Sequence, residues 1–245
     1  MIPKIIHYIW LGGKPLPKIA EKCIKSWQKY CPDYKIKRWD ESNLDLDKYQ
    51  FARDAYDAKK FAFASDVLRT DILYQYGGIY LDIDVELLKS IDEFLKYKIF
   101  MGFETSDLLN PGLLIGCEPS TFELEDILNI YQNLRFDVKK CKELTICDVY
   151  TDYFKEKQGL IPENSTQILD KNAFFSSEYF SPIDVITNKK KITKNTHSIH
   201  WYNASWYTPK QKMLKFLKKL ANLITFGYAG RCYQNIKKQK ELEWN

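Results

Sequence analysis

The sequence predicts an α/β fold in which a mostly parallel central sheet is flanked by helices. The first observation is the order of the segments, because strand, helix, strand, helix and strand patterns follow one another over the first 81 residues. The second is the stretch 61–86, FAFASDVLRTDILYQYGGIYLDIDVE, in which a helical period, two glycines and a short apolar run lead to two carboxylates.

The first half of the chain supplies most of these elements. Short β-branched or alternating runs predict strands at 4–9, 34–39 and 79–81. Apolar stripes at helical spacing predict helices at 19–30, 43–60 and 61–76, and Gly77 and Gly78 fit the stop of the third.

The second half of the chain is also predicted to alternate strands and helices. We expect a helical turn at 91–95, a strand at 98–103, a turn that becomes apolar at 110–117, and helices at 122–134 and 148–157. Residues 161–181 are expected to be loop with a short strand, and no site is assigned to them.

The two carboxylates of the central stretch are the first candidate site. In open α/β sheets, ligands bind beyond the carboxyl ends of strands, where Asp82 and Asp84 are expected. Alternation along an extended strand would point both side chains the same way, roughly 7 Å apart. Two such carboxylates suit Mg²⁺ or Mn²⁺, whereas the alternative is an acidic turn that binds no ion. Asp66 and Arg69 are three apart and share one face of the preceding helix.

Three segments together resemble a known family. IPKIIHYIWLGG at the amino end, ASDVLRTDILYQYGGIYLDIDVE in the middle and HSIHWYNASW at 197–206 are similar to the DXD-containing, sugar-binding glycosyltransferases of family 32. That group includes the yeast initiating mannosyltransferase and bacterial capsule transferases, and it is distantly similar to the glucosylating domain of large clostridial toxins. The resemblance implies a GT-A type nucleotide-sugar-binding fold.

The resemblance also implies roles for individual residues. Asp66, Arg69, Asp82 and Asp84 would be catalytic, and Mn²⁺ or Mg²⁺ would be held by Asp82, Asp84, His200 and Ser205. Donor binding would fall to a wider set: Ile9, Trp10, Ser65, Tyr80, Asn110, His200, Ser205 and Trp206. Within it, Trp10 would stack on the base and Trp206 would hold the glycosidic phosphate oxygen.

Several of these residues have a structural alternative. Trp10 can be a core residue, Asn110 a turn-former before Pro111, and the aromatic cluster at 197–206 simple packing. His7 lies inside the first predicted strand, and we expect a hydrogen-bonded core histidine there. Where the family usually has Thr-Gly-Pro, the chain has 149–152 as VYTD, so no acceptor-side residue is assigned.

Composition and charge separate the body from the carboxyl end. The chain has 45% hydrophobic and 28% charged residues, no apolar run of membrane-spanning length and no signal-peptide pattern at its start. Its six cysteines show no C-x-x-C pair, which favours reduced thiols and a cytoplasmic location.

The net charge of +5 comes from the end of the chain, because residues 210–245 hold nine Lys or Arg and two Glu. We therefore expect a GT-A domain at 1–209 and a basic amphipathic helical tail at 210–245. The tail suits an anionic membrane surface, so we expect peripheral binding on the inner face of the membrane. The alternative is a helix packed on the domain.

Together these expectations describe a metal-dependent, retaining glycosyltransferase. It would move a sugar from a UDP- or GDP-sugar to a saccharide acceptor, free or lipid-linked, in capsule or surface polysaccharide synthesis. The alternative function is a toxin-like effector that glycosylates a host protein. Nucleic-acid binding is disfavoured, because the basic residues are confined to one end and the body carries a slight acidic excess.

Overall fold

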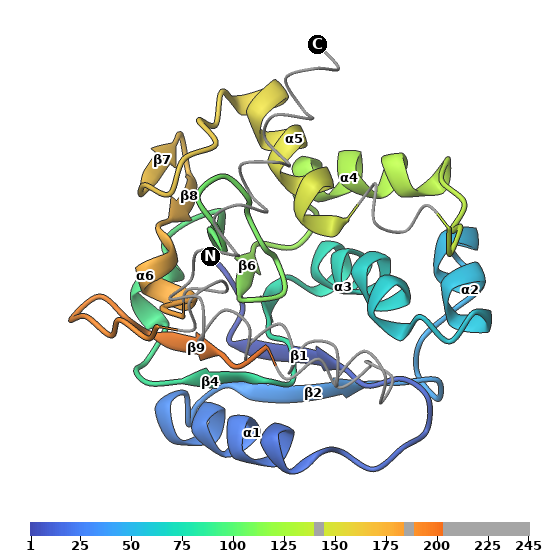
Figure 1. Cartoon of the computed structure of the whole chain (residues 1–245), viewed down its shortest axis with the longest axis horizontal. Helices are drawn as coiled ribbons and strands as arrows, with labels where there is room; N and C mark the ends of the chain where they lie inside the picture. The colour runs from blue at the N-terminus through green and yellow to red at the C-terminus, as the bar shows by residue number, and fades with distance from the viewer. Residues whose placement is uncertain (140–144, 184–188, 203–245) are drawn as a thin grey trace, which may run out of the picture. The chain divides into compact units, whose positions relative to one another are not determined.

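The computed structural model describes residues 1–139, 145–183 and 189–202, which are drawn in colour in Figure 1. The predicted tail at 210–245 and the predicted boundary at 209 lie outside these residues and stay predictions. Within the described part of the chain, no helix is both long enough and apolar enough to cross a membrane.

A central sheet has the strand order β2-β1-β3-β6-β5-β8-β7. Its strands are β1 (Ile5–Ile9), β2 (Lys35–Trp39), β3 (Gly78–Tyr80), β5 (Ile99–Gly102), β6 (Ile115–Cys117), β7 (Gln167–Leu169) and β8 (Asn172–Phe175). Strands β2, β1, β3, β5 and β8 run in one direction, and β6 and β7 run the opposite way. The predicted mostly parallel α/β sheet is therefore confirmed.

Helices cover both faces of this sheet (Figure 1). The helices are α1 (Lys18–Tyr30), α2 (Gln50–Asp57), α3 (Phe61–Tyr76), α4 (Phe122–Gln132), α5 (Ile146–Gln158) and α6 (Ser177–Phe180). Helices α2 to α5 enclose one hydrophobic core, whereas α1 and α6 enclose another. Strand alternation divides the side chains between the two, as Met101 packs in the first core and Phe100 in the second.

A small second sheet completes the second core. It pairs β4 (Val85–Leu87) with β9 (Ser198–His200) in antiparallel register, so that Val85 lies opposite His200. No sequence pattern predicts this pairing, because each strand has only three residues and more than 100 residues separate them.

The central stretch folds as predicted up to its last residues. Helix α3 spans 61–76 as expected and ends at Gly77, whose φ of 61° lies in the left-handed region. A Cβ there would lie 2.7 Å from the backbone nitrogen of Pro119, so the site also lacks room for a side chain. This stop directs the chain into β3 and sets the position of the two aspartates that follow.

The predicted helix at 43–60 is too long. Helix α2 occupies only Gln50–Asp57, because local side chains provide the preceding backbone with other partners. The Asn43 Oδ1 accepts from the backbone N–H of Asp40, and the Asp45 Oδ1 accepts from that of Asp47.

Candidate functional site

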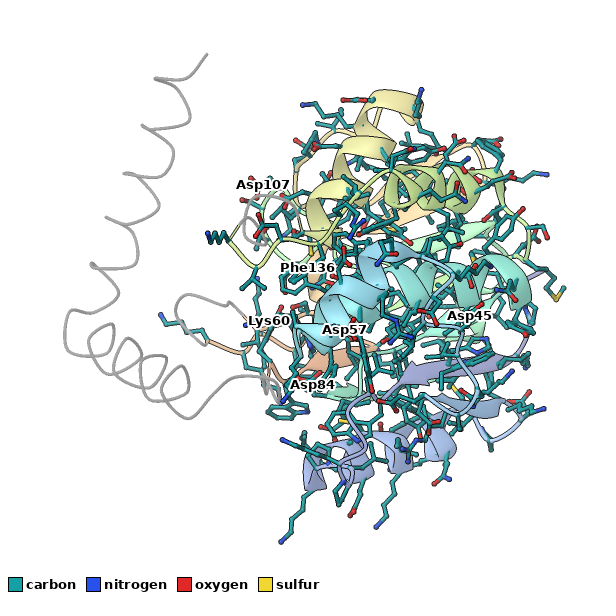
Figure 2. The ribbon with its side chains drawn as sticks, turned by 90° about the vertical axis from the view of Figure 1, so that its right-hand side faces the viewer. Asp45, Asp57, Lys60, Asp84, Asp107 and Phe136 are labelled. Atoms are coloured by element: carbon teal, nitrogen blue, oxygen red, sulfur yellow. The ribbon has the colours of Figure 1, made fainter. Side chains whose placement is uncertain are left out.

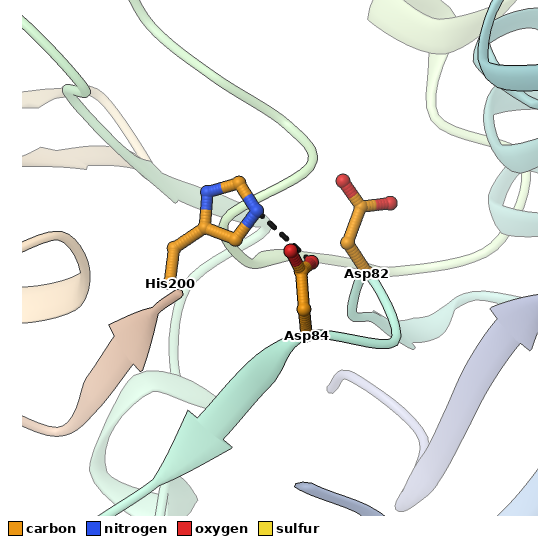
Figure 3. A group of neighbouring side chains, drawn as sticks. All are labelled: Asp82, Asp84 and His200. Atoms are coloured by element: carbon orange, nitrogen blue, oxygen red, sulfur yellow. Dashed lines mark hydrogen bonds and ion pairs between the residues drawn. The ribbon is translucent and has the colours of Figure 1, made fainter. Parts of the chain in front are cut away.

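The best-defined polar cluster combines Asp82, Asp84 and His200. The pairing of β4 with β9 brings His200 beside Asp84, although 116 positions separate them. One ligand atom from each of the three residues lies within 4.8 Å of the others (Figure 3). The described fold therefore joins the two aspartates of the central stretch to a residue from the late aromatic segment.

The two aspartates do not lie on an extended strand, as the sequence suggested. The backbone N–H of Val85 donates to the carbonyl of Asp82 at 3.0 Å, which closes a turn between β3 and β4. The turn rather than strand alternation brings both carboxylates to the same side. Their proximity was predicted correctly, but the geometry behind the prediction was wrong.

Charge in this cluster is concentrated and buried. Burial raises the pKa of Asp82, with the nearby Asp84 acting in the same direction and Arg69 and His200 opposing it. Burial alone would disfavour the His200 cation, but its contact with Asp84, 3.1 Å from Nε2 to Oδ1, outweighs this and raises the pKa of His200. Two carboxylates and one imidazole are a donor set that suits Mn²⁺.

Arg69 holds the neighbouring side chains in place from α3. Its side chain is 5% exposed, with Nη2 3.0 Å from Asp66 Oδ1 and Nη1 3.4 Å from Asp82 Oδ1. Nη2 also donates to the Ser65 hydroxyl at 3.0 Å, and the guanidinium carbon lies 4.6 Å from the centroid of the Tyr80 ring. The Tyr80 hydroxyl donates to Asp82 Oδ1 at 3.2 Å. The predicted residues of α3 and β3 therefore form one network with Asp82.

Asp66 is the carboxyl of this network with the largest change in proton affinity. Burial raises the pKa of Asp66 to about 7, and the charge of Arg69 only partly opposes the shift. The group therefore exchanges a proton near neutral pH, which is unusual for an aspartate.

The loop between β5 and β6 contacts Asp82 through Gly112, and Asn110 supports Gly112. Asn110 Oδ1 accepts from the backbone N–H of Gly112 at 2.7 Å, and the carbonyl of Gly112 accepts from the backbone N–H of Asp82 at 3.1 Å. A Cβ at position 112 would lie 2.5 Å from Asp82 Oδ2 and 2.8 Å from Arg69 Nη1. Only glycine fits at this contact, and the sequence did not single it out.

Trp10 follows β1 directly and is half-buried. Its indole N–H donates to the carbonyl of Lys14 at 2.5 Å, and its ring packs against the second core. The next turn is held by Glu41, which accepts from the backbone N–H of Gly12 at 2.5 Å. Ile9 is buried in the first core, so its side chain is not available to a ligand.

Figure 2 gives a side view of the candidate site. Asp84, Lys60 and Asp107 come from the β3–β4 turn, the start of α3 and the β5–β6 loop, and all three lie along the same side of the coloured ribbon. Ser205 and Trp206, predicted to reach the cation and the phosphate, lie outside the described residues and stay predictions.

Comparisons with known proteins find relatives of this chain among glycosyltransferases. Residues 17–101 match the family described as the glycosyltransferase sugar-binding region containing a DXD motif. Over 137 residues the chain is 39% identical to inositol phosphoceramide mannosyltransferase 3 of Schizosaccharomyces pombe, which is 53% of this chain and 37% of that protein. It is 26% identical over 235 residues to the uncharacterized glycosyltransferase L373 of Acanthamoeba polyphaga mimivirus, with 91% of both chains covered.

The fold has a counterpart among solved structures. The PaToxG glycosyltransferase superposes with a TM-score of 0.51 at 20% identity, over 64% of this chain and 70% of that one. This likeness confirms the predicted GT-A type fold. The chain spans well under half the length of the Schizosaccharomyces relative, so that relative's activity does not carry over as a whole.

Proposed function

We propose that this chain, whose residues 17–101 belong to the glycosyltransferase sugar-binding regions that contain a DXD motif, transfers a sugar from a nucleotide-sugar donor with the help of Mn²⁺ or Mg²⁺. The observation that carries the proposal is the cluster of Asp82, Asp84 and His200 at the end of β3. The donor is a UDP- or GDP-sugar and the acceptor a saccharide. A divalent cation bound there supplies a Lewis acid that stabilises the charge of a departing diphosphate.

The chain's own residues prepare the site for such a donor. Arg69 keeps Asp82 from turning away, because its guanidinium is fixed on three sides by Asp66, Ser65 and the Tyr80 ring. A bidentate or stacked arginine loses little freedom when it binds, which makes it a good fixed point. Asp66 and Arg69 orient the hydroxyls of the transferred sugar.

The raised pKa of Asp66 gives its carboxyl group a further role. Because burial raises the pKa of Asp66 to about 7, its carboxyl accepts or donates a hydrogen bond to a sugar hydroxyl according to pH. The Trp10 ring stacks on the base of the donor, in keeping with its half-buried place at the end of β1.

The names of the relatives favour a particular donor and acceptor. The Schizosaccharomyces relative is an inositol phosphoceramide mannosyltransferase, so its name joins a mannosyl group to a lipid headgroup. We infer a mannosyl donor and a lipid-linked saccharide acceptor for this chain as well. Transfer with retention of configuration and a role in capsule or surface polysaccharide synthesis remain part of the proposal.

Removal of one carboxylate tests the proposal most directly. We expect Asp82→Ala and Asp84→Ala each to lower sugar transfer by about 10²-fold or more, because a lost ligand costs several kcal/mol in the transition state. Transfer from UDP- and GDP-sugars would be measured with Mn²⁺ and with a chelator. Asp45→Ala is the matched control, since Asp45 is exposed and lies far from Asp84 in Figure 2. Near-full Mn²⁺-stimulated transfer by either site variant would contradict the proposal.

A membrane-bound acceptor would place the enzyme at a lipid surface, and the basic segment 210–245 suits that role. Each Lys or Arg near an anionic surface contributes about 1 kcal/mol, and salt screens the attraction. We expect the full chain to sediment with anionic vesicles at low salt, and a chain that ends at Pro209 to hydrolyse the donor but stay in the supernatant. Equal sedimentation of both proteins would show that the segment does not bind the membrane.

A further inference from the structure

Within the described residues, His200 is hydrogen-bonded through only one of its two ring nitrogens. Nε2 lies 3.1 Å from Asp84, whereas Nδ1 is buried and has no hydrogen-bond partner among the described residues. A histidine that binds a metal ordinarily donates its second ring N–H to a carboxylate or a carbonyl, and this bond sets the orientation of the ring. Among the described residues, no hydrogen bond at Nδ1 helps to orient the imidazole.

The contact that replaces it comes from Tyr202. The centroid of the Tyr202 ring lies 4.2 Å from that of His200, with 48° between the two planes. This separation is slightly shorter than the range of about 4.5–7 Å usual for packed aromatic rings, so the tyrosine limits the rotation of the imidazole.

The tyrosine is itself fixed at its hydroxyl. Its oxygen lies 2.6 Å from the hydroxyl of Ser181, and the hydroxyl is also hydrogen-bonded to Glu104. A carboxylate accepts only, so the phenol donates to Glu104 and accepts from Ser181. Glu104 accepts a second bond from Asn110 Nδ2 at 3.0 Å. The hydroxyl therefore joins the end of α6 to the β5–β6 loop.

The backbone of Tyr202 also has an unusual conformation. Its φ of 50° lies in the left-handed region, which is rare for a bulky side chain. Such a conformation persists only where the surrounding contacts determine it, and it concentrates at functional sites. The ring contact and the two hydroxyl bonds are among the contacts that hold it here.

We propose that Tyr202 is a positioning residue for the cation site: held by Ser181 and Glu104, its ring keeps the His200 imidazole directed at Asp84. This role rests on the proposed function, because it assumes that Asp82, Asp84 and His200 bind a divalent cation.

Calorimetric titration of the full chain with MnCl₂ alone tests this role without any transfer assay. Tyr202→Leu removes the ring, Tyr202→Phe removes only the hydroxyl, and Glu104→Gln weakens the anchor. We expect Tyr202→Leu to weaken Mn²⁺ binding by about 10-fold or more, and the two milder variants by a few-fold. Tyr153→Phe is the matched control, since it removes a tyrosine hydroxyl bonded to Asp126 rather than to the partners of Tyr202, and it should bind Mn²⁺ as the wild type does.

The outcomes separate this role from the proposed function. Loss of Mn²⁺ binding in Asp84→Ala together with unchanged binding in Tyr202→Leu would overturn the role of Tyr202 and leave the cation site intact. A wild-type chain that takes up no Mn²⁺ would overturn both. If Tyr202→Leu does not fold, Tyr202→Phe decides the matter, and affinity within about twofold of the wild type would then overturn the role.

Discussion

His7 and His200 are both buried, but their surroundings are opposite in kind. The Nε2 of His7 lies 3.0 Å from the carbonyl of Gly77, and its Nδ1 lies 3.0 Å from the indole nitrogen of Trp39. An indole only donates, so Nδ1 carries no proton and Nε2–H donates to the carbonyl. Burial then lowers the pKa of His7 to about 4. The expectation of a hydrogen-bonded core histidine is confirmed.

His200 has none of these features. Its Nε2 faces a carboxylate, its Nδ1 lacks a hydrogen-bond partner among the described residues, and Asp84 raises its pKa although the ring is buried. A histidine with both nitrogens matched stabilises the fold in one protonation state. A histidine placed against two carboxylates can exchange its proton for a cation. Burial alone therefore does not distinguish a structural histidine from a candidate ligand, whereas the partners of its two nitrogens do.

The largest expected effect on stability comes from replacing His7, the histidine whose two ring nitrogens are both hydrogen-bonded. His7→Leu leaves the Trp39 indole and the Gly77 carbonyl without partners, and two buried unsatisfied groups cost about 2–5 kcal/mol together. We expect the free energy of unfolding, measured by urea titration, to fall by that amount. His7→Gln keeps one donor and one acceptor and should recover part of the loss. A change below about 0.5 kcal/mol in His7→Leu would contradict the assigned hydrogen bonds.

Acid should weaken the fold through the same residue. The pKa of His7 is about 4 in the folded chain and about 6.5 when exposed, so the unfolded chain binds the extra proton first as the pH falls. The stabilising contribution is complete above pH 6.5 and declines as the pH approaches 4. By linkage the full decline is about 3 kcal/mol. Unfolding free energies at several pH values would measure it, and His7→Leu should show a shallower decline. Parallel curves for both proteins would contradict the lowered pKa.

The local elements of the fold were largely predictable from the sequence. Helix α3 and its glycine stop follow from a helical period and from Gly77, both of which act within a few residues. The predicted helix at 43–60 failed because Asn43 and Asp45 bond their own backbone neighbours, which an apolar stripe does not reveal.

Some residues of the candidate site were also predictable from local sequence patterns, whereas others depend on long-range contacts. Asp82 and Asp84 were found from an apolar run followed by two carboxylates, whereas His200 came only from the family resemblance. Its place beside Asp84 depends on the β4–β9 pairing, in which two three-residue strands meet across the chain. Tyr202 was missed because its role depends on Glu104 and Ser181, which no spacing in the sequence connects to it.

The smallest expected effect is the stabilisation of the fold by Mn²⁺, which should depend on His200 and not on His7. A ligand that binds only the folded state stabilises it by about 2.7 kcal/mol when its concentration is 100 times the dissociation constant. We expect Mn²⁺ to raise the unfolding free energy of the wild type by up to this amount. Most of this increase should be lost in His200→Ala, because one of the three candidate ligands is gone.

His7→Gln provides the matched control, since it alters a buried histidine away from the cluster and should keep the full Mn²⁺ increment. Thermal unfolding with MnCl₂ and with a chelator would measure both differences. An equal increment in His200→Ala and wild type would show that His200 is a structural residue like His7, and that Asp82 and Asp84 bind the ion without it.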